Sequence, residues 1–408
     1  MGLYSILEQR DLVSQVTHPE PLRKLLEEEQ GVKIYTGFDP TADSLHIGHL
    51  IPVMGLAHAQ RAGHHPIALV GGGTALIGDP TGKTALRQIL TREDIDHNVS
   101  RIKQQLSHFI SFEDDKASLV NNLDWLGQRN YLEMLRDIGR HFSVNRMLTA
   151  ECFKQRMEHG LSFLEFNYMI LQAYDFMHLN KEVGCQVQLG GDDQWSNMIA
   201  GVDLTRRMSQ NEAYALTYPL LTTSDGKKMG KTERGAVWLD PEKTSPHEYF
   251  QYWRNVPDDR IEACLKYFTF LEVTEIDSLV KVEGSALNEA KVRLAWEATT
   301  LLHGEDAAND AKEAAKAAFA GGGDRDKIPT TTLTSDETGE GLPLFDLLRR
   351  SGLATSGGEA RRLVKGGGVS VNGEKVNDPE KRYATEDFAS SLELRKGKKN
   401  VHLFRLAD

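Results

Sequence analysis

Short apolar runs separated by longer amphipathic segments dominate the first 232 residues of the chain. The runs are Val32 to Tyr35, Pro66 to Val70, Ser118 to Asn121, Cys185 to Leu189 and Leu216 to Thr222. Two of them end in consecutive glycines, which is typical of buried parallel strands that turn sharply at their carboxyl ends. Strands that alternate with helices predict an α/β fold, a Rossmann-like, doubly wound parallel sheet over residues 1–232. Ligands in such folds bind beyond the carboxyl ends of the strands.

Helical patterns precede, interrupt and follow this predicted sheet. Residues 1–31 predict helix with leucines as apolar anchors, and residues 122–165 predict an inserted helical segment. After residue 232 the pattern changes, because aromatic and aliphatic residues recur at helical spacing and alanine-rich stretches follow. Residues 233–320 therefore predict an α-helical domain. Residues 321–341 lack apolar periodicity and predict a flexible linker.

Residues 342–408 predict a small α+β domain. Leu344 to Ser351 and Ser356 to Lys365 predict two short helices, and Val369 to Val376 predicts a hairpin with an Asn-Gly turn. The region holds 13 Lys and Arg against 9 Asp and Glu, whereas the whole chain has a net charge of −11. A basic module on an acidic body favours contact with a polyanion such as a nucleic acid. The candidate RNA-binding residues are Arg361, Arg362, Lys365, Lys396, Lys398 and Lys399.

Overall composition is that of an ordinary globular protein, with 40% hydrophobic and 26% charged residues. No apolar stretch approaches the length of a membrane span, and the N-terminus lacks a signal pattern. Cys152, Cys185 and Cys264 are widely spaced, which predicts reduced thiols and a cytoplasmic location.

Two histidines stand where a helix is expected to begin after the first strand. His46 and His49 are three residues apart and share one face of that helix. The unpaired N–H groups of a first helical turn attract phosphate, and imidazoles there could donate hydrogen bonds to phosphate oxygens. On this pattern alone, a metal-binding pair and two surface histidines remain alternatives.

Two other stretches carry charged residues beside glycine. Lys228 to Thr232 places two lysines three apart in a loop that could close over a triphosphate, with a solvated basic loop as the alternative. Gly78 to Thr84 does not satisfy the nucleotide-triphosphate loop, because Ile77 stands where its first glycine is needed. Asp79 either binds a substrate ammonium group or caps a helix.

Together, His-Ile-Gly-His at 46–49 and Lys-Met-Gly-Lys-Thr at 228–232 resemble the two signatures of class I aminoacyl-tRNA synthetases. The second signature departs from the usual pattern at Gly230 and Thr232. The chain further resembles the bacterial tyrosyl-tRNA synthetase family at residues 35–46, 168–176 and 188–195. The likeness extends over essentially the whole chain, and the tail is similar to an RNA-binding domain shared with a ribosomal small-subunit protein. Asp192 and Ser196 depart from the family, which usually carries Ser and Gly there.

The resemblance implies a tyrosine–tRNA ligase. Such an enzyme activates L-tyrosine with ATP to tyrosyl-adenylate and pyrophosphate, then transfers tyrosine to the 3′-terminal ribose of tRNA(Tyr). A catalytically silent synthetase-like RNA-binding protein and a tryptophan–tRNA ligase are the alternatives. ATP is expected to enter with Mg²⁺, without a tightly bound cofactor or an evident metal cage. A homodimer is also implied, with residues 136–148 as a candidate interface segment.

The resemblance also assigns residues to roles. The implied catalytic residues are Thr41, His46, His49, Lys228, Lys231 and Thr232. The implied ATP-binding residues include His46, His49, Lys228 and Lys231 and add Gly37, Asp39, Gly48, Lys83, Arg87, Gly191 and Asp193. The implied tyrosine-binding residues are Tyr35, Asp79, Tyr168, Gln172, Asp175 and Gln194.

Overall fold

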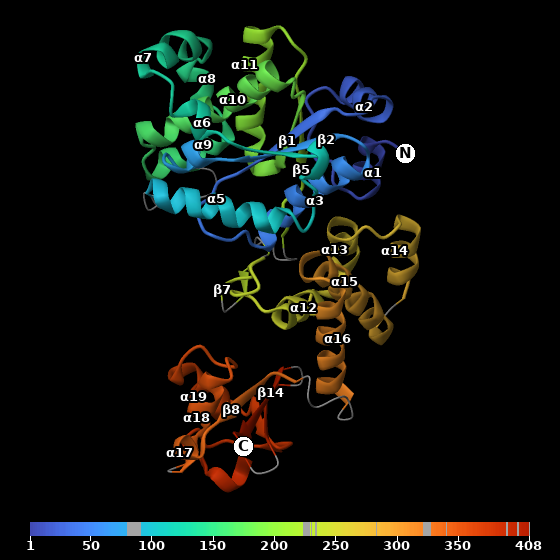
Figure 1. The fold of residues 1–408 in the computed structure, drawn as a ribbon, viewed down its shortest axis with the longest axis vertical. Helices are drawn as coiled ribbons and strands as arrows, with labels where there is room; N and C mark the ends of the chain where they lie inside the picture. The colour runs from blue at the N-terminus through green and yellow to red at the C-terminus, as the bar shows by residue number, and fades with distance from the viewer. Residues whose placement is uncertain are drawn as a thin grey trace. The chain divides into compact units, whose positions relative to one another are not determined.

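The computed structural model (Figure 1) shows that the chain folds into two compact units. It describes residues 1–79, 91–222, 229, 231–232, 235–282, 284–320, 328–339, 341–388, 391–397 and 400–407. The first unit comprises Met1–Ser245 and Tyr252–His303, and the second comprises Pro246–Gln251 and Gly304–Asp408.

A five-stranded parallel sheet forms the centre of the first unit, in the order β3-β2-β1-β4-β5. Its strands are β1 (Lys33–Phe38), β2 (His65–Val70), β3 (Ser118–Asn121), β4 (Val187–Gly191) and β5 (Tyr214–Tyr218). All five predicted runs are strands, and the predicted doubly wound α/β fold is confirmed. Strand order reverses between β1 and β4, and in such sheets ligands bind beyond the carboxyl ends of the strands at that point.

Helices cover both faces of this sheet, with α10 and α11 on one side and α3 and α5 on the other (Figure 1). The larger helices are α2 (Pro19–Glu28), α3 (Leu50–Arg61), α5 (Arg92–Leu106), α10 (Phe163–Val183) and α11 (Trp195–Ser209). Ser162 and Glu165 form a capping box at the start of α10, and Gly184 ends that helix in the left-handed conformation. These signals fix the length of the helix that carries three of the six predicted tyrosine-binding residues.

The inserted segment is helical, as predicted. It contains α6 (Leu123–Leu126), α7 (Tyr131–Glu133), η3 (Met134–Ile138), η4 (Gly139–His141), α8 (Val144–Leu148) and α9 (Glu151–His159). Shorter elements elsewhere in the sheet domain are α1 (Leu3–Gln9), η1 (Ile47–His49), α4 (Gly72–Ala75), η2 (Glu113–Asp115), η5 (Asp192–Gln194), β6 (Lys231–Thr232) and β7 (Gly235–Ala236). The helical region that follows holds α12 (Pro246–Arg254), η6 (Asp258–Arg260), α13 (Ile261–Phe268), α14 (Val273–Val280), η7 (Gly284–Ala286), α15 (Leu287–His303) and α16 (Glu305–Ala320).

The prediction of helix over residues 1–31 is wrong for the part between α1 and α2. Residues 14–17 are extended and pair with β5, where Ser14 N donates to Thr217 O at 2.9 Å and Thr17 N donates to Ala215 O at 3.0 Å. Pro19 is the first residue of α2, and a proline disfavours helical conformation in the residue before it. A new helix therefore starts at Pro19. The non-helical residues 14–17 before it form their backbone hydrogen bonds with the edge strand β5.

The tail of the second unit contains a second five-stranded sheet, in the order β11-β10-β13-β14-β8. Its elements are β8 (Thr330–Leu333), α17 (Ser335–Thr338), β9 (Leu342–Pro343), α18 (Leu344–Arg350), α19 (Gly357–Lys365), β10 (Val369–Val371), β11 (Glu374–Lys375), β12 (Arg382–Tyr383), η9 (Thr385–Phe388), β13 (Leu392–Lys396) and β14 (Asn400–Leu406). The two predicted helices and the hairpin are confirmed. Asn372 and Gly373 both have positive φ, 50° and 85°, as a two-residue hairpin turn requires.

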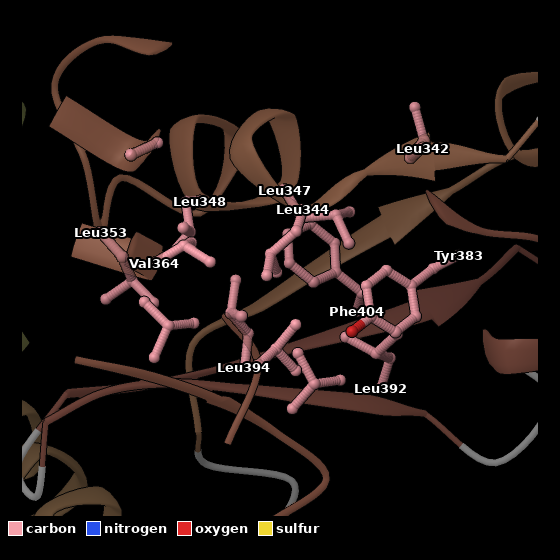
Figure 2. Packing of buried hydrophobic residues seen from close by; sticks show 14 of the residues in the cluster. Leu342, Leu344, Leu347, Leu348, Leu353, Val364, Tyr383, Leu392, Leu394 and Phe404 are labelled. Atoms are coloured by element: carbon pink, nitrogen blue, oxygen red, sulfur yellow. The ribbon is translucent and has the colours of Figure 1, made fainter. Parts of the chain in front are cut away.

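Apolar side chains of the tail meet between its helices and its sheet (Figure 2). Leu344 and Leu347 of α18 lie close to Leu394 and Phe404 of the strands, and all four are buried. This cluster gives the tail a hydrophobic core of its own.

The prediction of a flexible linker over 321–341 is wrong for its described second half. Residues 330–333 form β8, which runs parallel to β14 with Leu333 opposite Leu406. Leu333 belongs to the tail's core, and Ile328 packs with Val401 and Leu403. A run of three threonines has no apolar alternation, so the sequence of this segment does not predict a strand. Its extended conformation is stabilised by pairing with β14.

Candidate active site

The turn that holds the two histidines lies between β1 and α3. His46 Nδ1 accepts a hydrogen bond from Gly48 N at 3.0 Å, and His49 Nδ1 accepts one from His46 N at 3.1 Å. The two ring centroids are 4.0 Å apart. Because each Nδ1 is an acceptor, the proton of each neutral imidazole resides on Nε2. Both rings therefore offer an Nε2–H donor, which suits phosphate oxygens.

Gly48 is required for this arrangement. A Cβ atom at this position would lie 2.7 Å from Cε1 and 2.9 Å from Nδ1 of His46. Any side chain would push the His46 ring out of place, and the exposed glycine also leaves room above the turn. The structure thus gives Gly48 a role in orienting His46.

The stretch that follows the lysine-rich motif is fixed to the histidine turn. Ile47 N donates to Val237 O at 3.0 Å, and Leu239 N donates to Leu45 O at 2.9 Å. The backbone of residues 231–232 forms β6, paired with β7. The histidine turn is thus joined by backbone hydrogen bonds to the segment that begins five residues after the lysine-rich motif. Lys228, Lys83 and Arg87 lie outside the described residues, as do the side chains of Lys231 and Thr232.

Asp39 follows β1 at the same sheet edge. Its Oδ1 accepts a hydrogen bond from Thr74 Oγ1 at 2.9 Å, and its Oδ2 accepts one from the hydroxyl of Tyr168 at 3.0 Å. Gly37 and Thr41 are exposed on either side of it. The predicted nucleotide residue Asp39 and the predicted tyrosine residue Tyr168 are therefore in direct contact.

Asp79 and Gln194 also meet, from the segments that follow β2 and β4. Gln194 Nε2 donates to Asp79 Oδ2 at 2.8 Å, while Asn197 Nδ2 donates to Gln194 Oε1 at 3.1 Å. Asp193 precedes Gln194 in η5 and lies against Gly191, where an added Cβ would be 2.8 Å from Asp193 Oδ1. Only glycine at 191 allows this approach.

Tyr35 lies in the middle of β1 and is buried against Phe176 of α10, with ring centroids 5.2 Å apart. Its hydroxyl has no hydrogen-bond partner within the described part of the chain. Burial and the nearby charge of Asp175 raise the pKa of Tyr35 well above its usual value. The phenol is therefore neutral and can serve as a hydrogen-bonding group.

Asp175 is buried on α10 and accepts two strong hydrogen bonds. Asn122 Nδ2 donates to its Oδ2 at 2.8 Å, and Trp125 Nε1 donates to its Oδ1 at 2.7 Å. Burial raises the pKa of the Asp175 carboxyl to about 7, although both donors act in the opposite direction. A buried carboxyl with such a pKa is typical of a functional site.

Gln172 and Gln188 contribute two further buried acceptor atoms. Gln172 precedes Asp175 by three residues on α10, so the two share a helix face. Gln188 of β4 is directly opposite Tyr35 of β1, so their side chains point to the same side of the sheet. The Oε1 atoms of both glutamines are buried and have no hydrogen-bond partner among the described residues. Buried polar atoms without partners beside the apolar cluster of Tyr35 and Phe176 are compatible with a ligand that is apolar and carries polar groups.

Sequence reasoning missed Asn122, Trp125 and Gln188. Asn122 and Trp125 follow β3, a strand with a weak sequence pattern and no glycines at its end, unlike the strand that precedes Asp79. Gln188 could have been found as a polar residue inside an otherwise apolar strand. The structure shows that Asn122 and Trp125 donate hydrogen bonds to Asp175 and that Gln188 pairs with Tyr35 in the sheet.

The predicted RNA-binding residues of the tail differ in their surroundings. Arg362 and Lys365 are exposed on α19. Arg361 stacks over Phe345 at 3.8 Å and pairs with Glu380. Lys396 Nζ donates to the carbonyl oxygen of Leu353 at 3.0 Å and pairs with Glu359. Lys398 and Lys399 lie outside the described residues.

Among the helices that the structure describes, none has the length and apolar character that a membrane span requires.

The family model for class I tRNA synthetases (W and Y) matches residues 27–320, and the model for the S4 domain matches residues 342–388. The fold is accordingly that of a class I aminoacyl-tRNA synthetase. The chain is 56% identical over 402 residues to the tyrosine–tRNA ligase of Clostridium perfringens, covering 98% of each chain. It belongs to the tyrosine–tRNA ligase family.

Solved structures agree with this assignment. A C-terminally truncated mitochondrial tyrosyl-tRNA synthetase from Aspergillus nidulans matches with a TM-score of 0.68 and 33% identity, over 76% of this chain and 92% of that one. A tryptophanyl-tRNA synthetase from Encephalitozoon cuniculi matches with a TM-score of 0.56 and 14% identity, over 75% of this chain and 87% of that one. The latter likeness shows the fold alone.

The high pKa of Asp175 can be measured directly. Replacing Trp125 by Phe removes one donor to the carboxylate, so we expect the pKa of Asp175 to rise above about 7. Carbon-13 NMR titration of aspartate-labelled protein measures it, with Asp175→Asn to identify the resonance and Trp296→Phe as the control. A pKa near 4 in the unmodified protein would contradict the assignment.

Proposed function

We propose that the chain activates L-tyrosine with ATP and transfers it to the 3′-terminal ribose of tRNA(Tyr). The observation that carries this proposal is the pair of buried groups Tyr35 and Asp175, because the Tyr35 hydroxyl has no hydrogen-bond partner among the described residues and burial raises the pKa of Asp175 to about 7. The phenol of a bound tyrosine donates its hydrogen to the Asp175 carboxylate and accepts one from the Tyr35 hydroxyl. A ligand without that hydroxyl leaves both buried groups unpaired, which costs free energy for each of them.

The other end of the amino acid meets polar residues at the sheet edge. Asp79, Tyr168 and Gln172 bind the ammonium group, and Gln194 lies near the carboxylate. The hydrogen bond from Gln194 to Asp79 supports this assignment, because it brings the two ends of that subsite together. The acceptor atom of Gln172 is available for an ammonium donor.

Activation is an attack of the tyrosine carboxylate on the α-phosphorus of ATP. A bond forms between a carboxylate oxygen and phosphorus, and the bond between the α-phosphorus and the bridging oxygen of pyrophosphate breaks. The carboxylate is already a competent nucleophile, so neither a covalent enzyme group nor a general base is needed. Catalysis consists of positioning and of stabilising the charge on the phosphates.

The Nε2–H groups of His46 and His49 donate to phosphate oxygens in the transition state, beside Thr41. Lys83, Arg87, Lys228, Lys231 and Thr232 hold the departing pyrophosphate. ATP enters as its Mg²⁺ complex, so the metal arrives with the substrate. Gly37, Asp39 and Gly48 line the nucleotide path, and Asp193 beside Gly191 holds the adenosine ribose. The backbone connection between residues 45–47 and 237–239 supports joint action of the two motifs.

Transfer follows when a ribose hydroxyl at the tRNA 3′ end attacks the carbonyl carbon of the adenylate and AMP leaves. We assign residues 1–232 to catalysis, residues 233–320 to the anticodon side of the tRNA, and residues 342–408 to RNA binding. The exposed Arg362 and Lys365 are the strongest candidates for phosphate contacts in the tail. The proposed location is the cytoplasm, where the three buried, unpaired cysteines stay reduced.

The tryptophan and non-catalytic alternatives are less well supported. A tryptophan ligand has no hydroxyl for Tyr35 and Asp175, and the tryptophan enzyme is the more distant structural relative. The intact donor arrangement at His46 and His49 argues against loss of catalysis.

The pocket is tested by Asp175→Ala. We expect tyrosine-dependent exchange of pyrophosphate into ATP to fall at least about a hundredfold, because a buried hydrogen bond to a charged group is lost. The protein should stay folded by circular dichroism, and Asp96→Ala, an exposed aspartate of α5, is the matched control. Exchange measured with tyrosine, phenylalanine and tryptophan gives the selectivity, and unchanged kinetics in Asp175→Ala would refute the pocket.

The tail is tested by deleting it from residue 328, so that β8 leaves together with the sheet it completes. Exchange should stay within about twofold, while tRNA charging should fall at least about tenfold, since phosphate contacts supply much of the affinity for nucleic acid. Full-length protein with Arg362→Glu and Lys365→Glu should show a smaller loss. Equal charging rates with and without the tail would exclude this role.

We also propose a homodimer. Large apolar side chains are exposed in and beside the inserted segment, among them Leu132 at 73% and Val144 at 56%. Tyr131, Leu135, Phe163 and Leu164 extend the same region. Exposed apolar residues at this density mark an interaction surface, and Val144 belongs to the segment predicted from the sequence, residues 136–148.

The dimer is tested by placing a charge on this surface. Leu132→Asp should shift the sedimentation coefficient from that of a dimer toward that of a monomer in analytical ultracentrifugation at micromolar protein. Val282→Asp, an apolar position with 39% exposure outside the inserted segment, should not. A monomer in the unmodified protein at all concentrations would disprove the proposal.

A further inference from the structure

The turn η5 carries three consecutive polar side chains, and two of them face the active site. Gln194 is held by Asp79 and Asn197, and Asp193 lies against Gly191. The third, Asp192, has no part in the proposed mechanism.

Asp192 accepts three side-chain hydrogen bonds from two other segments. Ser14 Oγ donates to its Oδ2 at 2.6 Å, Gln15 Nε2 to its Oδ1 at 3.1 Å, and Thr217 Oγ1 to its Oδ1 at 2.5 Å. Both carboxylate oxygens take part, because Oδ2 accepts from Ser14 and Oδ1 accepts from Gln15 and Thr217. The carboxylate therefore fastens the turn both to β5 and to the N-terminal segment.

The N-terminal partner of Asp192 is itself fixed along the sheet edge. Gln15 N donates to Thr217 Oγ1 at 3.0 Å, and Thr217 N donates to Gln15 O at 2.8 Å. Val16 faces Leu216 in an antiparallel bridge. Thr217 is thus hydrogen-bonded to residue 15 through both its backbone and its side chain. The same side chain donates to Asp192, so the position of Asp192 depends on that of Gln15.

The same N-terminal segment, residues 10–17, is anchored at its other end on the helical region. We call it the N-terminal strap. The Arg10 guanidinium donates to three carbonyl oxygens at the end of α13, those of Lys266, Thr269 and Leu271, at 2.6 to 2.9 Å. Asp11 pairs with Lys266 at 2.7 Å. The strap is therefore held at both ends and offers Asp192 a rigid support.

We propose that Asp192 is a positioning residue for the nucleotide half of the active site. By tying η5 to the strap, it holds the neighbouring Asp193 carboxylate in the place where the ribose of ATP binds. The tyrosine half of the same turn has its own support, because Gln194 is held by Asp79 and Asn197. Removing the Asp192 carboxylate therefore raises the KM for ATP and leaves the KM for tyrosine largely unchanged. This inference rests on the proposed role of Asp193.

The test is pyrophosphate exchange with Asp192→Ala, measured against both substrates. We expect the KM for ATP to rise about tenfold and the KM for tyrosine to stay within about twofold, because small displacements of a positioning group cost this much. Asp192→Asn keeps an oxygen for Thr217 and Gln15 and an amide that can donate to Ser14, so it should restore most of the ATP affinity. Asp114→Asn, an exposed aspartate elsewhere in the first unit, controls for the lost charge.

A second variant alters the strap and leaves Asp192 in place. Ser14→Ala with Gln15→Ala removes two of the three donors and should raise the KM for ATP by a smaller factor. Combined with Asp192→Ala, it should add little further, since all the substitutions break one connection. Additive effects, or a lower melting temperature with unchanged KM for ATP, would reduce Asp192 to a purely structural residue and overturn the proposal. If unmodified protein showed no tyrosine-dependent exchange, the proposed function would fail instead, so the two failures are distinguishable.

Discussion

All five strands of the catalytic sheet are parallel, so all of their carboxyl ends meet at one edge. Everything in the site depends on this constraint. Asp39 follows β1, Asp79 follows β2, Asn122 follows β3 and Asp193 follows β4, although these residues span more than 150 positions of sequence. The reversal of strand order between β1 and β4 opens the space in which their side chains converge. Helix α10 then closes the pocket from one face with Tyr168, Gln172 and Asp175.

The group at this edge that is most unfavourable to bury is the carboxyl of Asp175, which is shielded from solvent. Burial alone would keep Asp175 protonated at neutral pH, and the two donors from Asn122 and Trp125 bring its pKa back to about 7. The result is a group that can accept a hydrogen bond from a phenol yet is poorly served by a purely apolar ligand. Selectivity for a hydroxyl thus arises from buried polar groups that a ligand must satisfy, and the two donors from beyond β3 matter as much as the carboxylate.

Much of this could be predicted from the sequence, and the failures share a cause. Strands, the tail helices and the Asn372-Gly373 hairpin carry local periodicity or turn chemistry, and they were found within a few residues. The role of Asp39 and Asp79 followed from glycine-rich strand ends and family likeness. The extended strap, β8, Asn122 and Trp125 were missed or mistaken because each is defined by a partner far along the chain. Residues 330–333 become a strand only beside β14, and no pattern within three threonines records that partner.

The N-terminal strap has a consequence for how the molecule is made. Ser14 and Gln15 bond to a residue 178 or 177 positions later, and Arg10 bonds to carbonyls 256 to 261 positions later. These residues are among the first to leave the ribosome, and their last partners emerge only when more than two thirds of the chain has been synthesised. Contacts over such separations form slowly, and N-terminal segments otherwise fold first. The nucleotide end of the site is therefore completed late in synthesis, by joining the oldest part of the chain to one of the newest.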